Sequence, residues 1–331
     1  MKFLPFLALP ALLFPLPLLA ADEPLFVFPA TCTLGQDCWT VNYVDVAAEE
    51  GAHNDYTYGV KSEDEHKGVD FALRSRAEMA AGVDVLAAAD GKVMRLRDGE
   101  SDSVKTDEEF EAIKKARKEC GNAVLIDHGG GLSTLYCHLK NGSLTVAIDD
   151  EVKAGQKIAQ IGQSGLSRFP HLHFGAVKGG AVLDPFTGET TSAGCGRFKR
   201  SYWKNDMPYE PITVFDGGFS AGTPDFAAIK EGARTPETLP AGGEGLALWA
   251  GFYQLRTGDE ITLKITDASG QVFAERHITA EENRSGPVYY YTGRSSSGAG
   301  TLPAGTYNGE ITYSRKGLEP QIMMRSVKVE P

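Results

Sequence analysis

The sequence predicts a mainly β protein, in which an antiparallel β domain is followed by a small immunoglobulin-like β-sandwich. Between residues 63 and 186, short apolar runs alternate with Gly, Asp and Asn, which is typical of short strands joined by tight turns. Between residues 213 and 331, strand-like runs return with turn residues about every ten positions, a spacing typical of a sandwich. We therefore expect sheets to form both cores.

Length and charge limit the classes of protein to which this chain can belong. Its 331 residues are enough for about two or three domains. The formal net charge is -11 at pH 7. Binding to a nucleic-acid backbone needs clustered Lys and Arg, so the acidic balance argues against nucleic acid as a partner.

Residues 1–21 have the layout of a secretory signal peptide. One Lys precedes a run rich in Leu, Phe and Ala, which prolines interrupt and which ends in the small residues Ala20 and Ala21. The run is too short and too rich in proline for a membrane-spanning helix, and no other segment reaches that length. We expect an exported protein, periplasmic or secreted, without a membrane span in its mature form. The alternative is an uncleaved N-terminal helix.

The rest of the chain is expected to divide into four stretches. Residues 22–62 are rich in turn formers and are expected to wrap around the following domain, with one strand-like run, CWTVNYVDV. Residues 63–186 form the first β domain, and 187–212 are a polar connector. Residues 213–331 form the C-terminal sandwich. Its aromatic run VYYYTG is expected to pack within the sheet, and a carbohydrate- or partner-binding surface is the alternative. Partner docking through this domain therefore stays open.

A charged stretch at about residues 98–119 interrupts the first domain. Phe110, Ile113 and Ala116 follow at helical spacing, which predicts a short helix with Gly121 to end it. The stretch would either shape and cover a substrate site or be a solvated decoration of the surface.

The five cysteines are disulfide candidates, because exported proteins meet oxidising conditions. Cys32 and Cys38 would close a small loop. Cys120 and Cys137 flank a predicted hairpin, whose two arms would bring them together, and Cys195 is left over. The sequence lacks the paired Cys-x-x-Cys spacing of a zinc ribbon.

Three short motifs in the first domain carry its candidate site residues: EHKGVDFAL with His66 and Asp70, LYCHLKNG with His138, and PHLHFGA with His171 and His173. The glycine between His66 and Asp70 permits a turn, and the alternation after it predicts a loop leading into a strand. In a strand, His171 and His173 share one face while the leucine between them faces the core.

Two imidazoles and one carboxylate suit a three-ligand zinc site with a position left for water. His66, Asp70 and one of the PHLHFGA histidines would supply the ligands, and strand spacing does not say which. The alternative is a surface salt bridge between His66 and Asp70, a structural His138 and two ordinary surface histidines. His128 is expected in a hairpin turn rather than at the site.

Over about residues 60–186 the chain resembles the lysostaphin-like zinc metallopeptidases, of the peptidoglycan DD-metallopeptidase or murein endopeptidase type. The three motifs match in order, as do the runs VLAAADGKV, NAVLIDHGGGLSTLYCHL, VKAGQKIAQIGQSG and LDPF. The resemblance implies an antiparallel β domain with an open groove. The charged insertion and the regions on either side of the domain fall outside the resemblance.

The resemblance also implies a role for each site residue. His66, Asp70 and His173 would bind one zinc ion per chain. His138 and His171 would flank the attacking water and the tetrahedral intermediate of amide hydrolysis.

We therefore expect an exported zinc endopeptidase that hydrolyses cross-links of bacterial peptidoglycan, with stem peptides and cross-bridges as its partners. The alternatives are a non-catalytic wall-binding or activator protein of the same fold, and a protein whose working part is the C-terminal sandwich. The motifs do not indicate which bond is cut.

Overall fold

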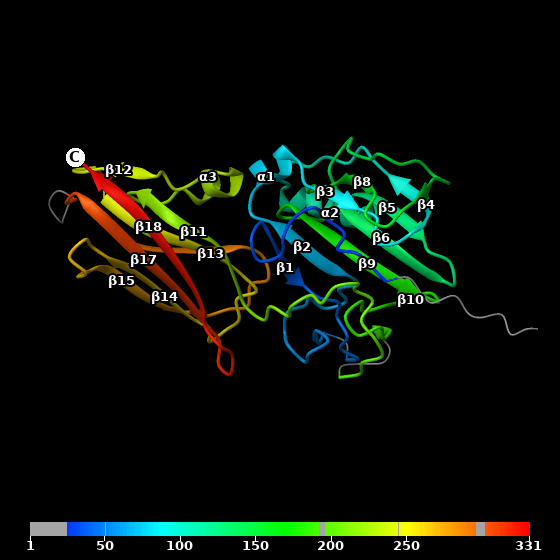
Figure 1. Ribbon diagram of the computed structural model, residues 1–331. Helices are drawn as coiled ribbons and strands as arrows, with labels where there is room; N and C mark the ends of the chain where they lie inside the picture. Colours follow the sequence, from blue (N-terminus) through cyan, green and yellow to red (C-terminus); the bar gives the residue numbers. More distant parts are fainter. Residues whose placement is uncertain (1–24, 50, 192–195, 244, 296–301) are drawn as a thin grey trace, which may run out of the picture.

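Figure 1 shows the computed structural model, in which one large β domain is joined to a second group of β sheets. The signal peptide predicted at residues 1–21 and Cys195, for which the sequence predicts no partner, lie outside the residues that the structure describes. The described residues are 25–49, 51–191, 196–243, 245–295 and 302–331.

The first domain is built on an antiparallel sheet with the strand order β1-β2-β9-β6-β5-β4-β7, and β10 pairs with β9. Its strands are β1 (Cys38–Asn42), β2 (Val69–Leu73), β4 (Gly91–Arg97), β5 (Asn122–Asp127), β6 (Leu132–Leu139), β7 (Glu151–Val152), β9 (His171–Lys178) and β10 (Ala181–Val182). A small sheet pairs β3 (Asp84–Leu86) with β8 (Lys157–Gln160). The prediction of a mainly β fold is thus confirmed.

The sequence alternation explains why these segments are strands. In β5, every second residue is buried, with Val124 and Ile126 in the core, as expected for a strand with one face on the core. Strand β9 lies between β2 and β6, and its pairing places His173 opposite both Asp70 and Cys137. This register brings the three sequence motifs to neighbouring strands.

The charged insertion contains the predicted helix, α2 (Asp107–Lys115). Thr106 and Glu109 form a capping box at its start, in which each side chain accepts a hydrogen bond from the other residue's backbone N–H. The prediction that Gly121 ends the helix is wrong, because the helix has already ended at Lys115. Gly121 instead has a φ of 60° in the turn that leads into β5, a conformation that favours glycine.

The C-terminal region contains two further sheets, with strand orders β11-β13-β16 and β12-β18-β17-β14-β15. Apolar residues from both sheets form one core, for example Leu248 of the first and Leu263 of the second. The strands are β11 (Thr213–Ala221), β12 (Thr238–Pro240), β13 (Gly245–Tyr253), β14 (Glu260–Thr266), β15 (Val272–Thr279), β16 (Val288–Ser295), β17 (Gly305–Ser314) and β18 (Gln321–Glu330). The immunoglobulin-like assignment of these sheets stays a prediction.

The two parts of the molecule share a small apolar cluster. Trp39 and Ala72 of the first sheet pack with Phe215 and Tyr253 of the C-terminal strands. Two short helices, α1 (Arg76–Ala81) and α3 (Phe226–Glu231), also meet between the two parts. The C-terminal sheets are therefore in contact with the strands that carry the candidate site.

Both predicted disulfides are present. Cys32 is bonded to Cys38 and Cys120 to Cys137, with Cα–Cα distances of 5.9 and 4.8 Å. Among the described residues, the helices are all too short or too polar to span a membrane.

Candidate metal site

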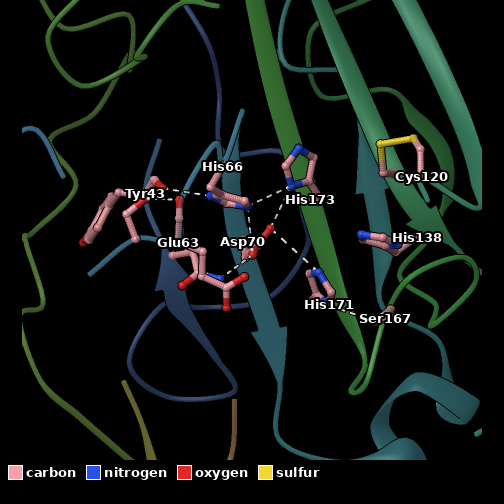
Figure 2. Close-up of polar contacts among 12 residues, drawn as sticks. Tyr43, Glu63, His66, Asp70, Cys120, His138, Ser167, His171 and His173 are labelled. Atoms are coloured by element: carbon pink, nitrogen blue, oxygen red, sulfur yellow. Dashed lines mark hydrogen bonds and ion pairs between the residues drawn. A yellow bond between two sulfur atoms is a disulfide. The ribbon is translucent and has the colours of Figure 1, made fainter. Parts of the chain in front are cut away.

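The metal-ligand candidates lie together where β2 and β9 pair (Figure 2). His66 lies on the loop before β2, Asp70 lies in β2 and His173 in β9. His66 Nε2 is 3.1 Å from His173 Nδ1 and 3.1 Å from Asp70 Oδ2, and His173 Nδ1 is 2.9 Å from Asp70 Oδ1. The loop and two strands thus aim three donor groups at one point.

Two neighbouring residues orient these groups. His66 Nδ1 lies 2.8 Å from the carbonyl oxygen of Tyr43, which can only accept, so Nδ1 carries the proton and Nε2 keeps its lone pair for a metal. Asn42 donates from Nδ2 to Asp70 Oδ2 at 2.8 Å and holds the carboxylate in place. Both residues belong to the N-terminal segment, through β1 and the residues that follow it.

The charges at the site favour an ionised carboxylate. Burial alone would raise the pKa of Asp70, but the charges of His66 and His171 and the hydrogen bonds from His173 and His66 together lower it well below its ordinary value. Burial lowers the pKa of His66, but Asp70 and the Tyr43 carbonyl outweigh it and raise that pKa to about 9 in the metal-free protein. A cation is therefore stabilised at this point.

The residues present fit a zinc ion. Each of the three offers one ligand atom, and these atoms all lie within 4.8 Å of one another. Ligand atoms about 2.1 Å from a tetrahedral zinc ion would lie about 3.4 Å apart, close to the separations found here. Two imidazole nitrogens and one carboxylate oxygen are also a common donor set for catalytic zinc.

His138 and His171 lie beside this group rather than within it. The His138 and His171 rings are 4.5 Å apart, and His171 Nε2 is 3.8 Å from Asp70 Oδ1. His138 Nδ1 donates to the Ser164 carbonyl at 2.8 Å and His171 Nδ1 to the Phe169 carbonyl at 3.0 Å. In both rings Nε2 is therefore the unprotonated nitrogen when the ring is neutral.

Burial, followed by the neighbouring His171 and His173, lowers the pKa of His138 well below its ordinary value. His138 is thus neutral at neutral pH and able to accept a proton. His171 is buried, which is inconsistent with the alternative of ordinary surface histidines. His128 lies beyond the end of β5 and contacts the Asp90 carbonyl and Thr134, as expected for a turn residue.

Gly68 lies at a bend in the loop that leads from His66 into β2, as the sequence predicts. It is also closely packed, because a Cβ at this position would lie 2.6 Å from His173 Nε2 and 2.7 Å from the Phe174 carbonyl. Only a residue without a side chain leaves room for the His173 ring.

The site lies in a groove of about 1560 Å³. Helix α2 of the insertion contributes Phe110 to its lining, and Arg168 lies over the Phe110 ring at 4.5 Å. The C-terminal region contributes Tyr253 and Tyr289. The insertion is therefore part of the groove wall rather than only a surface decoration.

Sequence reasoning missed several residues around the site. Asn42 and Tyr43 lie far from the histidine motifs in the chain, and only the pairing of β1 with β2 brings them to the ligands. Tyr253 and Tyr289 come from the C-terminal sheets. The strand-like run CWTVNYVDV is the one sequence signal that could have pointed to Asn42 and Tyr43.

Part of the chain is similar to known proteins. Residues 64–185 match the family model described as peptidase family M23. The chain is 30% identical over 146 residues to a DD-carboxypeptidase/endopeptidase, Mpg, of Neisseria meningitidis serogroup B, a match that covers 43% of this chain and 28% of that protein. It is 31% identical over 129 residues to the murein hydrolase activator NlpD of Escherichia coli, covering 39% of this chain and 27% of that protein.

Among solved structures, the chain is similar to the catalytic domain of lysostaphin from Staphylococcus simulans. The match has 28% identity and a TM-score of 0.27, and covers 37% of this chain and 77% of that one. The chain thus spans less than a third of the length of the two curated relatives described here.

Proposed function

We propose that this protein is an exported, zinc-dependent endopeptidase that hydrolyses peptide cross-links of bacterial peptidoglycan. The match of residues 64–185 to the model of peptidase family M23 supports this proposal. The observation that carries the proposal is the group of His66, Asp70 and His173, whose three ligand atoms converge in the groove. A curated relative named as a DD-carboxypeptidase/endopeptidase supports an endopeptidase activity.

When bound, zinc would supply Lewis acidity and a water molecule of lowered pKa. The chain's own residues would bind, orient and move protons. His138 Nε2 is held unprotonated by the bond from Nδ1 to Ser164, so this nitrogen can accept a proton from the attacking water. His171 is oriented in the same way through Phe169. Once its Nε2 has taken up a proton, this nitrogen can donate a hydrogen bond to the oxyanion or pass the proton to the leaving amine.

We propose the following organisation for the rest of the chain. Residues 1–21 would be removed on export, which the two disulfides support because such bonds persist in oxidising compartments. Residues 63–186 would form the peptidase domain. Residues 213–331 would form an immunoglobulin-like sandwich that flanks the groove.

Digestion of purified peptidoglycan tests this function. The protein is incubated with peptidoglycan, with and without a zinc chelator, and the released fragments are identified by mass spectrometry. We expect cleavage within cross-linked peptides, loss of cleavage with the chelator, and recovery when zinc is added back. Intact peptidoglycan after incubation with the zinc-loaded protein would contradict the proposal.

A second candidate function is a non-catalytic activator of other wall hydrolases, which the similarity to a relative named as a murein hydrolase activator favours. This function predicts that the zinc-loaded protein alone releases no fragments but increases the fragments released by an added murein hydrolase. The complete set of ligand candidates and the unprotonated Nε2 of His138 favour the enzyme.

A further inference from the structure

A residue of the C-terminal sheets is linked by hydrogen bonds to the candidate metal ligand Asp70. Gln254, directly after β13, donates from Nε2 to Asn42 Oδ1. Asn42 in turn donates from Nδ2 to Asp70 Oδ2 at 2.8 Å. All three side chains are buried, so water does not compete for these bonds.

The ionised state of Asp70 determines which group donates in each of these two hydrogen bonds. A metal-binding carboxylate is ionised and can only accept hydrogen bonds, so Asn42 must present its NH₂ group to Asp70. Its oxygen then faces Gln254, which must present its own NH₂ group in return. A side chain at position 254 without a donor would leave the oxygen of Asn42 buried and unpaired, or allow the amide to turn away from Asp70.

Gln254 is held firmly enough to act as an anchor. Its φ is 57°, in the left-handed region that residues other than glycine rarely adopt. Arg315 donates to its carbonyl oxygen at 2.6 Å and Tyr313 at 3.3 Å, and its own N–H donates to the Ser285 carbonyl at 3.2 Å. These contacts fix the backbone from which the Gln254 side chain reaches Asn42.

We propose that Gln254, acting through Asn42, is a positioning residue that holds the Asp70 carboxylate in the orientation needed for metal binding. The C-terminal sheets then contribute to the metal affinity of the peptidase domain, in addition to lining the groove. This inference rests on the zinc site of the proposed function, but its test does not depend on peptidase activity.

The test compares the zinc dissociation constant of the full-length wild type with that of single and double variants. Gln254→Met keeps the length of the side chain but removes the Nε2 donor. No other side-chain hydrogen bond is lost, because Gln254 Oε1 has no hydrogen-bond partner among the described residues. We expect a roughly threefold to tenfold weaker zinc affinity for Gln254→Met, and about 10- to 100-fold for Asn42→Ala. The double variant should bind zinc as weakly as Asn42→Ala alone, because both changes break one chain of bonds.

Thr213→Val is the matched control. It removes another buried hydrogen bond between a C-terminal strand and the N-terminal segment, the 2.9 Å bond from Lys61 Nζ to Thr213 Oγ1, but this bond has no link to Asp70. We expect its zinc affinity to equal that of the wild type. Chelator competition measures the affinity, and the visible spectrum of the cobalt-substituted protein reports on ligand geometry.

Gln254→Leu is the second variant, in case Gln254→Met does not fold. Leu also has no donor, so the oxygen of Asn42 would again be left unpaired and zinc affinity should fall as for Gln254→Met. Wild-type zinc affinity in a folded variant of Gln254, or independent effects in the double variant, would overturn the proposal. A wild type that holds zinc but cuts no peptidoglycan would contradict only the proposed function, and a wild type without zinc would overturn both.

Discussion

At the scale of single residues, the site depends on backbone positions as much as on its ligands. Gly68 lies against the His173 ring. Gly175, which follows His173 by two residues in β9, has room for a methyl group, because a Cβ there would lie 3.4 Å or more from its neighbours. The two glycines therefore offer a comparison between a close approach and ordinary contact.

We predict that Gly68→Ala displaces the His173 ring and weakens zinc binding by roughly tenfold or more, because ligand positions tolerate little displacement. Gly175→Ala should bind zinc like the wild type. Zinc affinity measured by chelator competition, together with near-UV circular dichroism to check folding, distinguishes the two. Equal zinc affinities for the folded variants would show that the close contact at Gly68 has no effect on the ligand.

Because His138 lies beside the ligand candidates rather than among them, substitutions at His138 and at a ligand candidate should have different effects on zinc binding. We predict that Asp70→Asn loses both zinc and peptidase activity, because the charged ligand is removed from a buried site. His138→Gln should keep about one zinc per chain but lose about 100-fold or more in kcat, the range expected for a general acid or base. Metal analysis beside peptidoglycan digestion checks both variants. Activity in a zinc-free Asp70→Asn protein would rule out the scheme.

The ligand candidates could be predicted from the sequence because their motifs carry chemistry that is independent of the fold. His66, Asp70 and one PHLHFGA histidine already formed a plausible zinc set before the structure placed His173 among the ligand atoms. The catalytic roles of His138 and His171 stay predictions. Asn42 could not be recognised, since an asparagine in an apolar run has no signature until a strand pairing brings it to Asp70.

At the scale of elements, β9 organises the site, because its two neighbours carry the other motifs. Its register with β2 and β6 could not be read from the sequence, since strand order depends on contacts between distant segments. The alternation of buried and exposed residues did predict where most strands lie. The sequence did not indicate α1 or α3, since each has only six residues and a single buried one.

The disulfide between Cys120 and Cys137 joins the end of the insertion to β6, next to His138. The His138 N–H also donates to the Cys120 carbonyl at 2.8 Å. We predict that replacing both cysteines by Ser lowers the free energy of unfolding by about 3 kcal/mol, as expected for a closed loop of this length. Urea denaturation measures the change.

The pair Cys32 and Cys38 is the control for this prediction. It closes a shorter loop, with a sequence separation of 6 rather than 17, so its replacement by Ser should cost less stability. An equal or larger loss from the shorter loop would argue against loop closure as the source of the stabilisation.

At the scale of the whole molecule, the N-terminal segment links the other two parts. Its strand β1 completes the edge of the large sheet beside β2. Its Asn42 receives the bond from Gln254, and its Lys61 contacts the start of β11. The sequence indicated a wrapping segment, but contacts between positions 212 and 152 residues apart leave no local pattern from which they could be predicted.

Lys61, at the contact between the N-terminal segment and β11, makes the free energy of unfolding depend on pH. Its side chain is fully buried, and Nζ donates to the Glu210 carbonyl at 2.5 Å and to Thr213 Oγ1 at 2.9 Å. Burial lowers the pKa of Lys61 from 10.5 to about 7, although the charge of Glu210 opposes the shift. Between these two pH values the unfolded chain binds a proton at Lys61 that the folded protein does not.

We predict that this difference makes the free energy of unfolding rise between about pH 7 and pH 10, with a slope of up to about 1.4 kcal/mol per pH unit from Lys61. Below about pH 7 the residue is protonated in both states, so its contribution no longer changes with pH. Lys61→Met should lack this contribution, and the difference between the two proteins isolates it from other titrating groups. Urea denaturation of both proteins across this range measures the slopes. Parallel slopes, or a wild type that loses stability relative to Lys61→Met as the pH rises, would show that Lys61 keeps its proton when the molecule folds.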